Sequence, residues 1–204
     1  PIAEIAKFVP GLRVEFRQES TEKLLELLLG GKVSAAIAGD IQDMPARIDN
    51  WPLFAERYVA VVALNHDLAK HPAIDAEQLR SEIILARAGC DVAPKIWNWG
   101  FAGSPPKLGH RSEHEVHLQH LVAAGFGVIL APEHMPHLPT LKTVPIEGDP
   151  IWREVRLLAM QGRRYSPALD AFVKVARQWD WAPEDGLDRR PPATGRHEAV
   201  GVAV

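Results

Sequence analysis

The sequence contains a single cysteine, Cys90, among its 204 residues. One thiol excludes an internal disulfide framework and every zinc module that needs several cysteines. A surplus of one charge sign is also absent, since 26 acidic residues stand against 23 basic ones, for a formal net charge of -3. Binding to nucleic acid through general electrostatic attraction needs a clustered basic excess, so the composition argues against that function.

Long hydrophobic runs are missing as well. The apolar stretches, such as residues 59–64, are far too short to span a bilayer. No charged-then-apolar leader follows Pro1, so nothing in these residues directs export. Ile2, Ile5 and Val9 fall at helical spacing directly after the first residue, and we therefore interpret the sequence as a fragment of a longer polypeptide.

Strand-like and helix-like segments alternate along the chain. Short apolar or alternating segments predict strands at residues 14–18, 35–38, 58–64, 83–86, 107–111, 128–130 and 155–159. Apolar residues at helical spacing or capping signals predict helices that begin near Ile2, Ser20, Asp75, Pro94, Ser112 and Ser166. This alternation indicates an α/β protein with a mostly parallel sheet.

The order of these elements predicts two Rossmann-like lobes joined by a hinge. We expect lobe I, lobe II and a disordered tail to take residues 1–62 with 161–181, residues 63–160 and residues 182–204, respectively. The chain would cross between the lobes near residues 62–64 and 156–160. Ligands of open α/β sheets bind where strands end and helix N-termini point outward, so the cleft between the lobes would hold a small molecule.

Four segments share a pattern with one known family. They are STEKLLELLLGGKVSAAIAG at residues 20–39, WPLFAERYVAVVALNHDLA at 51–69, HLVAAGFGVILAP at 120–132 and GRRYSPALDAF at 162–172. The first joins an acidic, leucine-rich helix, a glycine turn and a small apolar strand. In this order and spacing the four segments resemble the effector-binding domain of LysR-type transcriptional regulators, over about residues 1–180.

The resemblance implies a fold like that of type 2 periplasmic binding proteins, and a small, often anionic effector in the cleft, with no cofactor. It also implies dimers formed side by side that assemble into tetramers. The effector would shift the population of lobe arrangements and so alter the spacing of the DNA-binding domains. The winged helix-turn-helix, the linker helix and the first strand of this domain would lie before Pro1. We therefore expect a cytoplasmic protein that binds DNA only through that absent N-terminal part and contacts no membrane.

Eight positions near strand ends and helix starts are candidates for effector binding: Ser20, Thr21, Gly39, Asp40, Arg87, Ala88, His114 and Phe126. Ser20 and Thr21 follow a strand at a helix N-terminus, where free N–H groups and hydroxyls suit a carboxylate. Glu19 would oppose such a ligand, and a plain helix cap is the alternative interpretation. The resemblance places Gly39 and Asp40 at a pocket position of the family.

The second lobe supplies the remaining candidates. Arg87 and Ala88 follow the strand at residues 83–86, and the Arg87 guanidinium can bind a carboxylate with two hydrogen bonds or stay a solvated charge. His114 lies near a position where relatives often carry a small hydroxyl residue. Phe126 either forms an apolar wall of the cleft or packs in the core.

Three sharper alternatives are less well supported. Four histidines, at positions 110, 114, 117 and 120, together with Glu113 and Glu115 raise the idea of a metal site. However, His114 and His120 lie about 120° apart around a helix and converge poorly. Cys90 lies near a cation but has no clear base partner, so we do not expect a reactive thiol. We see no phosphate loop, nucleophile elbow or convergent acid/base pair and expect no enzyme.

The main alternative function is that of an exported solute-binding protein that serves a transporter. The missing leader and the LysR-like segments argue against this alternative.

Overall fold

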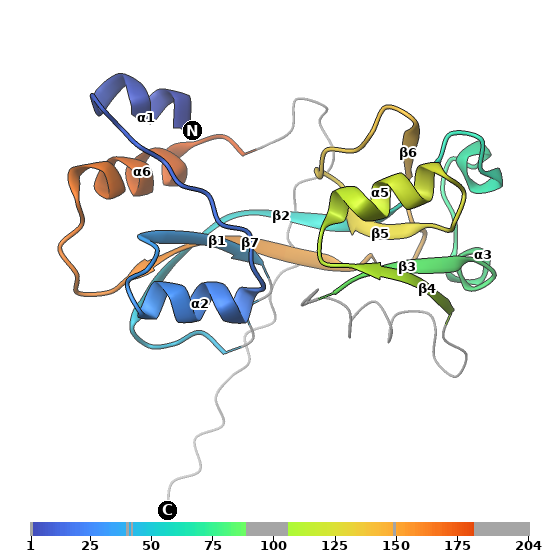
Figure 1. Cartoon of the computed structure of the whole chain (residues 1–204), viewed down its shortest axis with the longest axis horizontal. Coiled ribbons are helices and arrows are strands. Elements are labelled where there is room, and N and C mark those ends of the chain that lie inside the picture. Colours follow the sequence, from blue (N-terminus) through green and yellow to red (C-terminus); the bar gives the residue numbers. More distant parts are fainter. Residues whose placement is uncertain (1, 40, 42, 89–105, 149, 182–204) are drawn as a thin grey trace, which may run out of the picture.

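The structure is a computed structural model that describes residues 2–39, 41, 43–88, 106–148 and 150–181 (Figure 1). The helix expected near residues 94–101 and the tail expected at residues 182–204 lie outside these ranges, as do Asp40 and Cys90. What the sequence predicts for those residues therefore stays a prediction.

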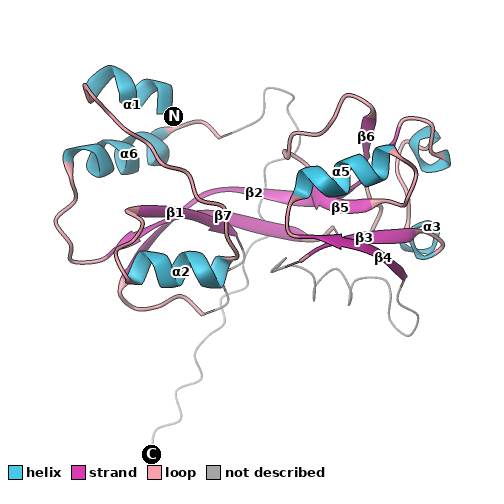
Figure 2. Ribbon diagram, viewed as in Figure 1, coloured by secondary structure: helices cyan, strands magenta, loops and turns pink. Residues whose placement is uncertain are grey.

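Helices flank a set of strands that runs the length of the molecule (Figure 2). The helices are α1 (Ile2–Phe8), α2 (Thr21–Leu29), the 3-10 helix η1 (Asp67–Lys70), α3 (Ala76–Arg80), α5 (Glu115–Ala123) and α6 (Pro167–Gln178). The strands are β1 (Ala35–Gly39), β2 (Ile48–Ala63), β3 (Ile83–Arg87), β4 (Lys107–Ser112), β5 (Ile129–Pro132), β6 (Leu141–Val144) and β7 (Trp152–Met160). The α/β class expected from the sequence is confirmed.

Two long strands, β2 and β7, connect two halves of the molecule. Figure 1 shows the half with α1, α2, α6 and β1 at one end of these strands and the half with α3, α5 and β3 to β6 at the other. β2 pairs with β7 from Ile48 to Arg57, then with β5 and β6 from Tyr58 to Ala63. All of these pairings and the β1–β7 pairing are antiparallel, and among the named strands only β3 and β4 pair in parallel. The expectation of a mostly parallel sheet is therefore wrong for the described residues, because a chain that crosses between halves and returns aligns its two crossings in opposite directions.

The strand expected at residues 14–18 does not form among the described residues. This segment belongs to no ladder, and the side chains of Val14 and Phe16 are 47% and 78% exposed. A strand needs a neighbour to bond with, and on its other edge β1 has no partner among the described strands. A hollow of about 510 Å³ lies between this segment, Ile37 of β1 and Leu169 of α6. The further strand that the resemblance implies before Pro1 stays a prediction.

Capping residues predicted from the sequence begin three of the helices. Ser20 caps α2 by accepting a hydrogen bond from the Lys23 N–H at 3.3 Å. Asp75 and Gln78 form a reciprocal capping box on α3, and Ser166 caps α6 ahead of a proline in the first turn. Each cap satisfies N–H groups that a helix leaves without intrahelical partners, which explains why these starts were predictable.

The start of α5 differs from its prediction. The pattern Ser112-x-x-Glu115 predicts a capping box, but β4 continues through Ser112, which pairs with Arg87. The helix therefore begins later, with His114 as its N-cap and no capping bond from the His114 side chain. The Ser112 hydroxyl instead accepts a hydrogen bond from the His114 N–H at 3.1 Å. Glu115 thus becomes the first residue of the helix rather than the third residue of a capping box.

The buried apolar residues form separate clusters in the two halves. In the first half, Leu28 and Leu158 are fully buried between α2 and the sheet. In the second, Ile74 lies in a cluster on one side of β2, and Leu118 and Val122 of α5 lie in a cluster on the other. Each half thus has a core of its own, which is the physical requirement for two units that can change their relative arrangement. Every helix among the described residues falls short of the length and apolar character that a bilayer crossing requires.

Candidate functional site

Two adjoining cavities lie where β2 and β7 pass between the halves, and together we call them the cleft. The larger has a volume of about 630 Å³ and the smaller about 250 Å³. Four residues line both cavities: Gln18, Tyr58, Arg87 and Arg153. The shared residues make the cavities parts of one site, and the volume of the larger is in the range of small-molecule binding sites.

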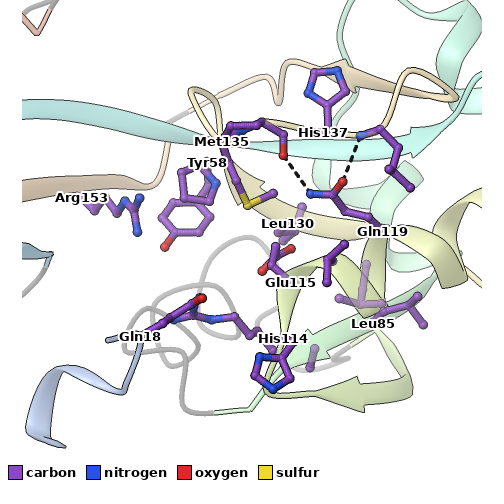
Figure 3. Close-up of a pocket in the computed structure, with 17 residues that line it drawn as sticks. Gln18, Tyr58, Leu85, His114, Glu115, Gln119, Leu130, Met135, His137 and Arg153 are labelled. Carbon is purple, nitrogen blue, oxygen red and sulfur yellow. Dashed lines mark hydrogen bonds between the residues drawn. The ribbon is translucent and has the colours of Figure 1, made fainter. Parts of the chain in front are cut away.

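Each half supplies one wall of the cleft. From the first half come the segment before α2, the first turn of α2 and the end of β1. From the second half come the end of β3, the first turn of α5, β5 and the loop at residues 135–138. Figure 3 shows the larger cavity, with Arg153 and Tyr58 on one side and Gln18 and His114 on another. A ligand here would contact both halves.

A buried ion pair fixes the position of Arg153 between the cavities. The Glu56 side chain is 2% exposed, and its Oε1 accepts a hydrogen bond from the Arg153 Nε at 2.7 Å and lies 2.6 Å from the Arg153 Nη2 in the ion pair. Oε2 of Glu56 accepts a further bond from the His134 N–H at 3.3 Å, and the Arg153 guanidinium lies 5.9 Å from the centre of the Tyr58 ring. Burial alone would lower the pKa of Arg153, but Glu56 and Tyr58 reverse the effect and raise it. Arg153 is therefore permanently charged and already paired.

The other arginines of the cleft form ion pairs within the chain, whereas Arg87 forms none with a described residue. Arg17 pairs with Glu15 at 2.8 Å and Arg153 with Glu56. Arg87 ends β3, lines both cavities and forms no ion pair with any other residue that the structure describes. Its five N–H donors are the strongest attraction that the cleft offers to an anionic group.

The match to a known family agrees with this geometry. Residues 2–181 match the model of the LysR substrate binding domain. The chain belongs to that family. The transcriptional dual regulator GltC of Bacillus subtilis (strain 168) is 27% identical to it over 179 residues, which are 81% of this chain and 58% of GltC. The chain thus spans somewhat more than half the length of this LysR-type relative.

Solved structures of LysR effector-binding domains have the same fold. The effector binding domain of QuiR in complex with shikimate has a TM-score of 0.73 at 23% identity, with 87% of each chain covered. The regulatory domain of CcmR from Synechocystis PCC6803 in complex with 2-PG has a TM-score of 0.74 at 15% identity, with 87% of this chain and 88% of that one covered. These similarities confirm for this LysR domain the fold related to type 2 periplasmic binding proteins.

The structure brings four of the eight candidate residues to the cleft. Thr21 and Gly39 line the smaller cavity, His114 lines the larger one, and Arg87 lines both. They come from separate elements of both halves, which the sequence pattern placed at strand ends and helix starts. Their roles in binding stay predictions.

Of the other four candidates, the three that the structure describes line neither cavity. Ser20 caps α2 and lines neither cavity, and the Ala88 N–H donates to the Ser112 carbonyl at 2.9 Å. Phe126 is 50% exposed, with the His110 ring against it at 5.2 Å between ring centres. Asp40 lies outside the described residues.

The sequence reasoning missed several residues of this LysR cleft, among them Gln18, Tyr58, Glu115, Gln119 and Arg153. The sequence does not single out Glu56 and Arg153, because each stands beside another charged residue of its strand, Arg57 in β2 and Glu154 in β7. Gln119 is engaged structurally: its amide donates to the Pro136 carbonyl at 2.9 Å, and its oxygen accepts from the Leu138 N–H at 3.0 Å (Figure 3). Gln119 thereby anchors the loop that forms one wall of the larger cavity.

Glu115 places a negative charge in the larger cavity. In Figure 3 its side chain lies between the Tyr58 and Leu130 side of the cavity and the Gln18 and His114 side. It forms no hydrogen bond or ion pair with another residue in the described part of the chain. Burial raises the pKa of the Glu115 carboxyl, and the positive charges of Arg87 and Arg153 only partly offset that effect.

The raised pKa of Glu115 predicts how a substitution at this residue changes the stability of the unliganded domain. Because folding disfavours the charged form of Glu115, the carboxylate costs stability above its folded pKa, and the cost disappears below its unfolded pKa. Glu115→Gln should therefore raise the melting temperature at pH 7, on the order of 2 °C, given that 1 kcal/mol corresponds to about 2–4 °C for this chain length. The difference from wild type should shrink toward zero near pH 4, close to the ordinary pKa of a glutamate. Thermal unfolding of both proteins across this pH range checks it, and a variant less stable than wild type at pH 7 would contradict it.

The histidines near α5 do not gather around a common point. The rings of His114 and His117 meet edge to face, with 5.2 Å between their centres. Within the described ranges, no group of three or more histidine, cysteine, aspartate or glutamate side chains could hold one metal ion. The idea of a reactive Cys90 falls on a residue outside these ranges.

Proposed function

We propose that this chain is the effector-sensing domain of a LysR-type transcriptional regulator and that it binds a small molecule with an anionic group in the cleft. The observation that carries the proposal is Arg87, which lines both cavities and forms no ion pair with another described residue. Membership of the LysR substrate binding domain family supports the sensing role. The similar domains of QuiR and CcmR, in complex with shikimate and 2-PG, support a small-molecule ligand.

The sensing mechanism is a shift between arrangements of the two halves. The two halves meet close to Tyr58, where the pairing partner of β2 changes from β7 to β5 and β6. The Tyr58 N–H donates to the Ile151 carbonyl at 2.8 Å, so the two crossings lie side by side there. A ligand that contacts both walls favours the arrangement in which it makes both sets of contacts, and its differential affinity sets the size of the shift.

The output of this shift belongs to the longer protein. The domain would form homodimers or homotetramers, and a winged helix-turn-helix before Pro1 would bind DNA in the cytoplasm. The relation to GltC, a transcriptional dual regulator of which the chain covers 58%, supports a further part with that role. Effector binding in the cleft would then change the spacing of the DNA-binding parts.

Replacing Arg87 with alanine tests the ligand site. A thermal-shift screen of small carboxylates, aromatic acids and amino acids first identifies compounds that stabilise the wild-type chain. For those compounds, Arg87→Ala should weaken binding by roughly tenfold to a hundredfold, because a hydrogen bond to a charged group contributes about 1.5–3 kcal/mol. Isothermal titration calorimetry measures the affinity, and the far-UV circular dichroism spectrum should not change.

The matched control is Arg111→Ala. Arg111 is an exposed arginine on the neighbouring strand β4 and lines neither cavity, so its removal should leave affinity within about twofold. Equal affinity of Arg87→Ala and wild type would remove Arg87 from the site. A screen in which no compound stabilises the chain would contradict the proposed function itself.

A further inference from the structure

The cleft contains charges of both signs. Arg153 and Glu56 neutralise each other in a hydrogen-bonded ion pair, and Arg17 is paired with Glu15. Of the charged side chains that line the larger cavity, Arg87 and Glu115 form no ion pair with another described residue. A ligand in this cavity therefore encounters one cationic group from the end of β3 and one anionic group from the first turn of α5.

These two charges select among ligands. A compound that carries only carboxylates would pair with Arg87 but would bring its negative charge into the same cavity as the Glu115 carboxylate. That carboxylate is partly buried, so water screens the repulsion less well than at the surface. A compound that also carries a cation would instead satisfy Glu115 on binding, and the cost of burying that carboxylate would be recovered in the complex.

We propose that the effector is zwitterionic, with a carboxylate that binds Arg87 and a protonated amine that binds Glu115, as in a free amino acid. This inference rests on the proposed function, because it specifies the ligand of the same cleft. The rest of the effector packs against the apolar part of the wall, where Leu85, Leu130 and Met135 lie. A cavity of about 630 Å³ has room for an amino acid with a large side chain.

Glu115 has a second possible role, which the test must separate from this one. An acidic residue in the first turn of a helix stabilises that helix through the partial positive charge of its N-terminus. A purely structural role would make Glu115→Gln affect all ligands alike. If Glu115 contacts an amine of the ligand, Glu115→Gln should weaken the binding only of ligands that carry that amine.

The experiment compares amino acids with their deaminated counterparts on the same protein. The probes are L-leucine with 4-methylpentanoate, L-phenylalanine with 3-phenylpropanoate, and L-glutamate with glutarate, so that each pair differs by one amino group. Calorimetry on the wild-type chain should give at least one amino acid that binds tenfold or more tightly than its partner. In Glu115→Gln this preference should fall at least tenfold, through weaker binding of the amino acid, while the deaminated acid binds equally well or better.

The control variant is Glu113→Gln, two residues earlier. Glu113 is exposed and lines neither cavity, so the wild-type preference should persist. Deaminated acids that bind as well as the amino acids would overturn the inference and leave the proposed function standing. A preference for amino acids that persists in Glu115→Gln would overturn the inference in the same way. If none of the six probes binds, the zwitterion inference fails, and the broader screen described for Arg87 decides whether the proposed function fails with it.

Discussion

Glu56→Ala should lower the free energy of unfolding by about 3–5 kcal/mol, which is the typical cost of removing one partner of a buried ion pair. Glu56 is 2% exposed, and its carboxylate forms a hydrogen-bonded ion pair with Arg153 and accepts a further hydrogen bond from the His134 N–H. Without it, the Arg153 guanidinium stays in a partly buried position with no carboxylate to compensate its charge. Urea-induced unfolding of the variant and wild type, followed by circular dichroism, measures the difference.

The control for this variant is a more exposed ion pair on the neighbouring strand β7. Arg156 and Glu154 of β7 approach to 2.8 Å, but about a third of each side chain is exposed. Glu154→Ala should cost only about 0–1 kcal/mol, because water already solvates such a pair. An equal loss of unfolding free energy in Glu56→Ala and Glu154→Ala would show that burial does not increase the contribution of the Glu56 pair to stability. The double variant Glu56→Ala/Arg153→Ala should lose less than the two single losses combined, since the uncompensated charge is then gone.

Local signals in the sequence predict much of the secondary structure of this LysR domain. Ser166 with Pro167 and Ser20 with its leucine stripe each define a helix start from a few neighbouring residues. The apolar segments at residues 35–38 and 83–86 become β1 and β3, with one further residue each. Such elements are predictable because the groups that determine them lie within one or two turns of each other.

Features of the fold that depend on contacts between residues far apart in the sequence could not be predicted from local patterns. Glu56 and Arg153 are 97 positions apart, so their pairing depends on the antiparallel register of β2 with β7. The direction of the strands has the same origin, because it follows from how the chain crosses between halves. Residues 14–18 alternate like a strand, yet without a described neighbour they form no ladder.

The candidate site was predictable where a charge stands at the end of a strand. Arg87 satisfies that rule, and the structure places it in the cleft. Glu115 was interpreted as a capping residue or as part of a histidine-rich metal site, and the extension of β4 through Ser112 changes its position. A shift of two residues in the helix start thus converts a residue predicted to cap a helix into a residue that lines the cavity.

Gly127→Ala is the second substitution with a large expected effect. Gly127 has a φ of +147°, and a Cβ atom built on it would lie 2.2 Å from the Ile83 carbonyl oxygen. Backbone cannot yield here as a flexible side chain could, so we expect the variant to lose about 2–6 kcal/mol through strain and overpacking combined. Chemical denaturation measures the loss, and Gly125→Ala serves as the control. Gly125 also has a positive φ, of +82°, but its added Cβ would meet nothing within 4 Å, so only the strain cost of about 1 kcal/mol remains.

The same substitution connects the stability of the fold with the ligand site. Gly127 lies directly before Val128, whose N–H donates to the Ile83 carbonyl at 2.9 Å and whose carbonyl accepts from the Leu85 N–H at 2.8 Å. A Cβ at residue 127 pushes against Ile83, the first residue of β3, and β3 ends at Arg87. Any folded fraction of Gly127→Ala should therefore hold Arg87 in a displaced position and bind carboxylate ligands more weakly than Gly125→Ala does. Equal stability and equal affinity in Gly127→Ala and Gly125→Ala would contradict this prediction. That result would mean that β3 can shift without cost, and that the position of Arg87 in the cleft does not depend on the contact between residues 127 and 83.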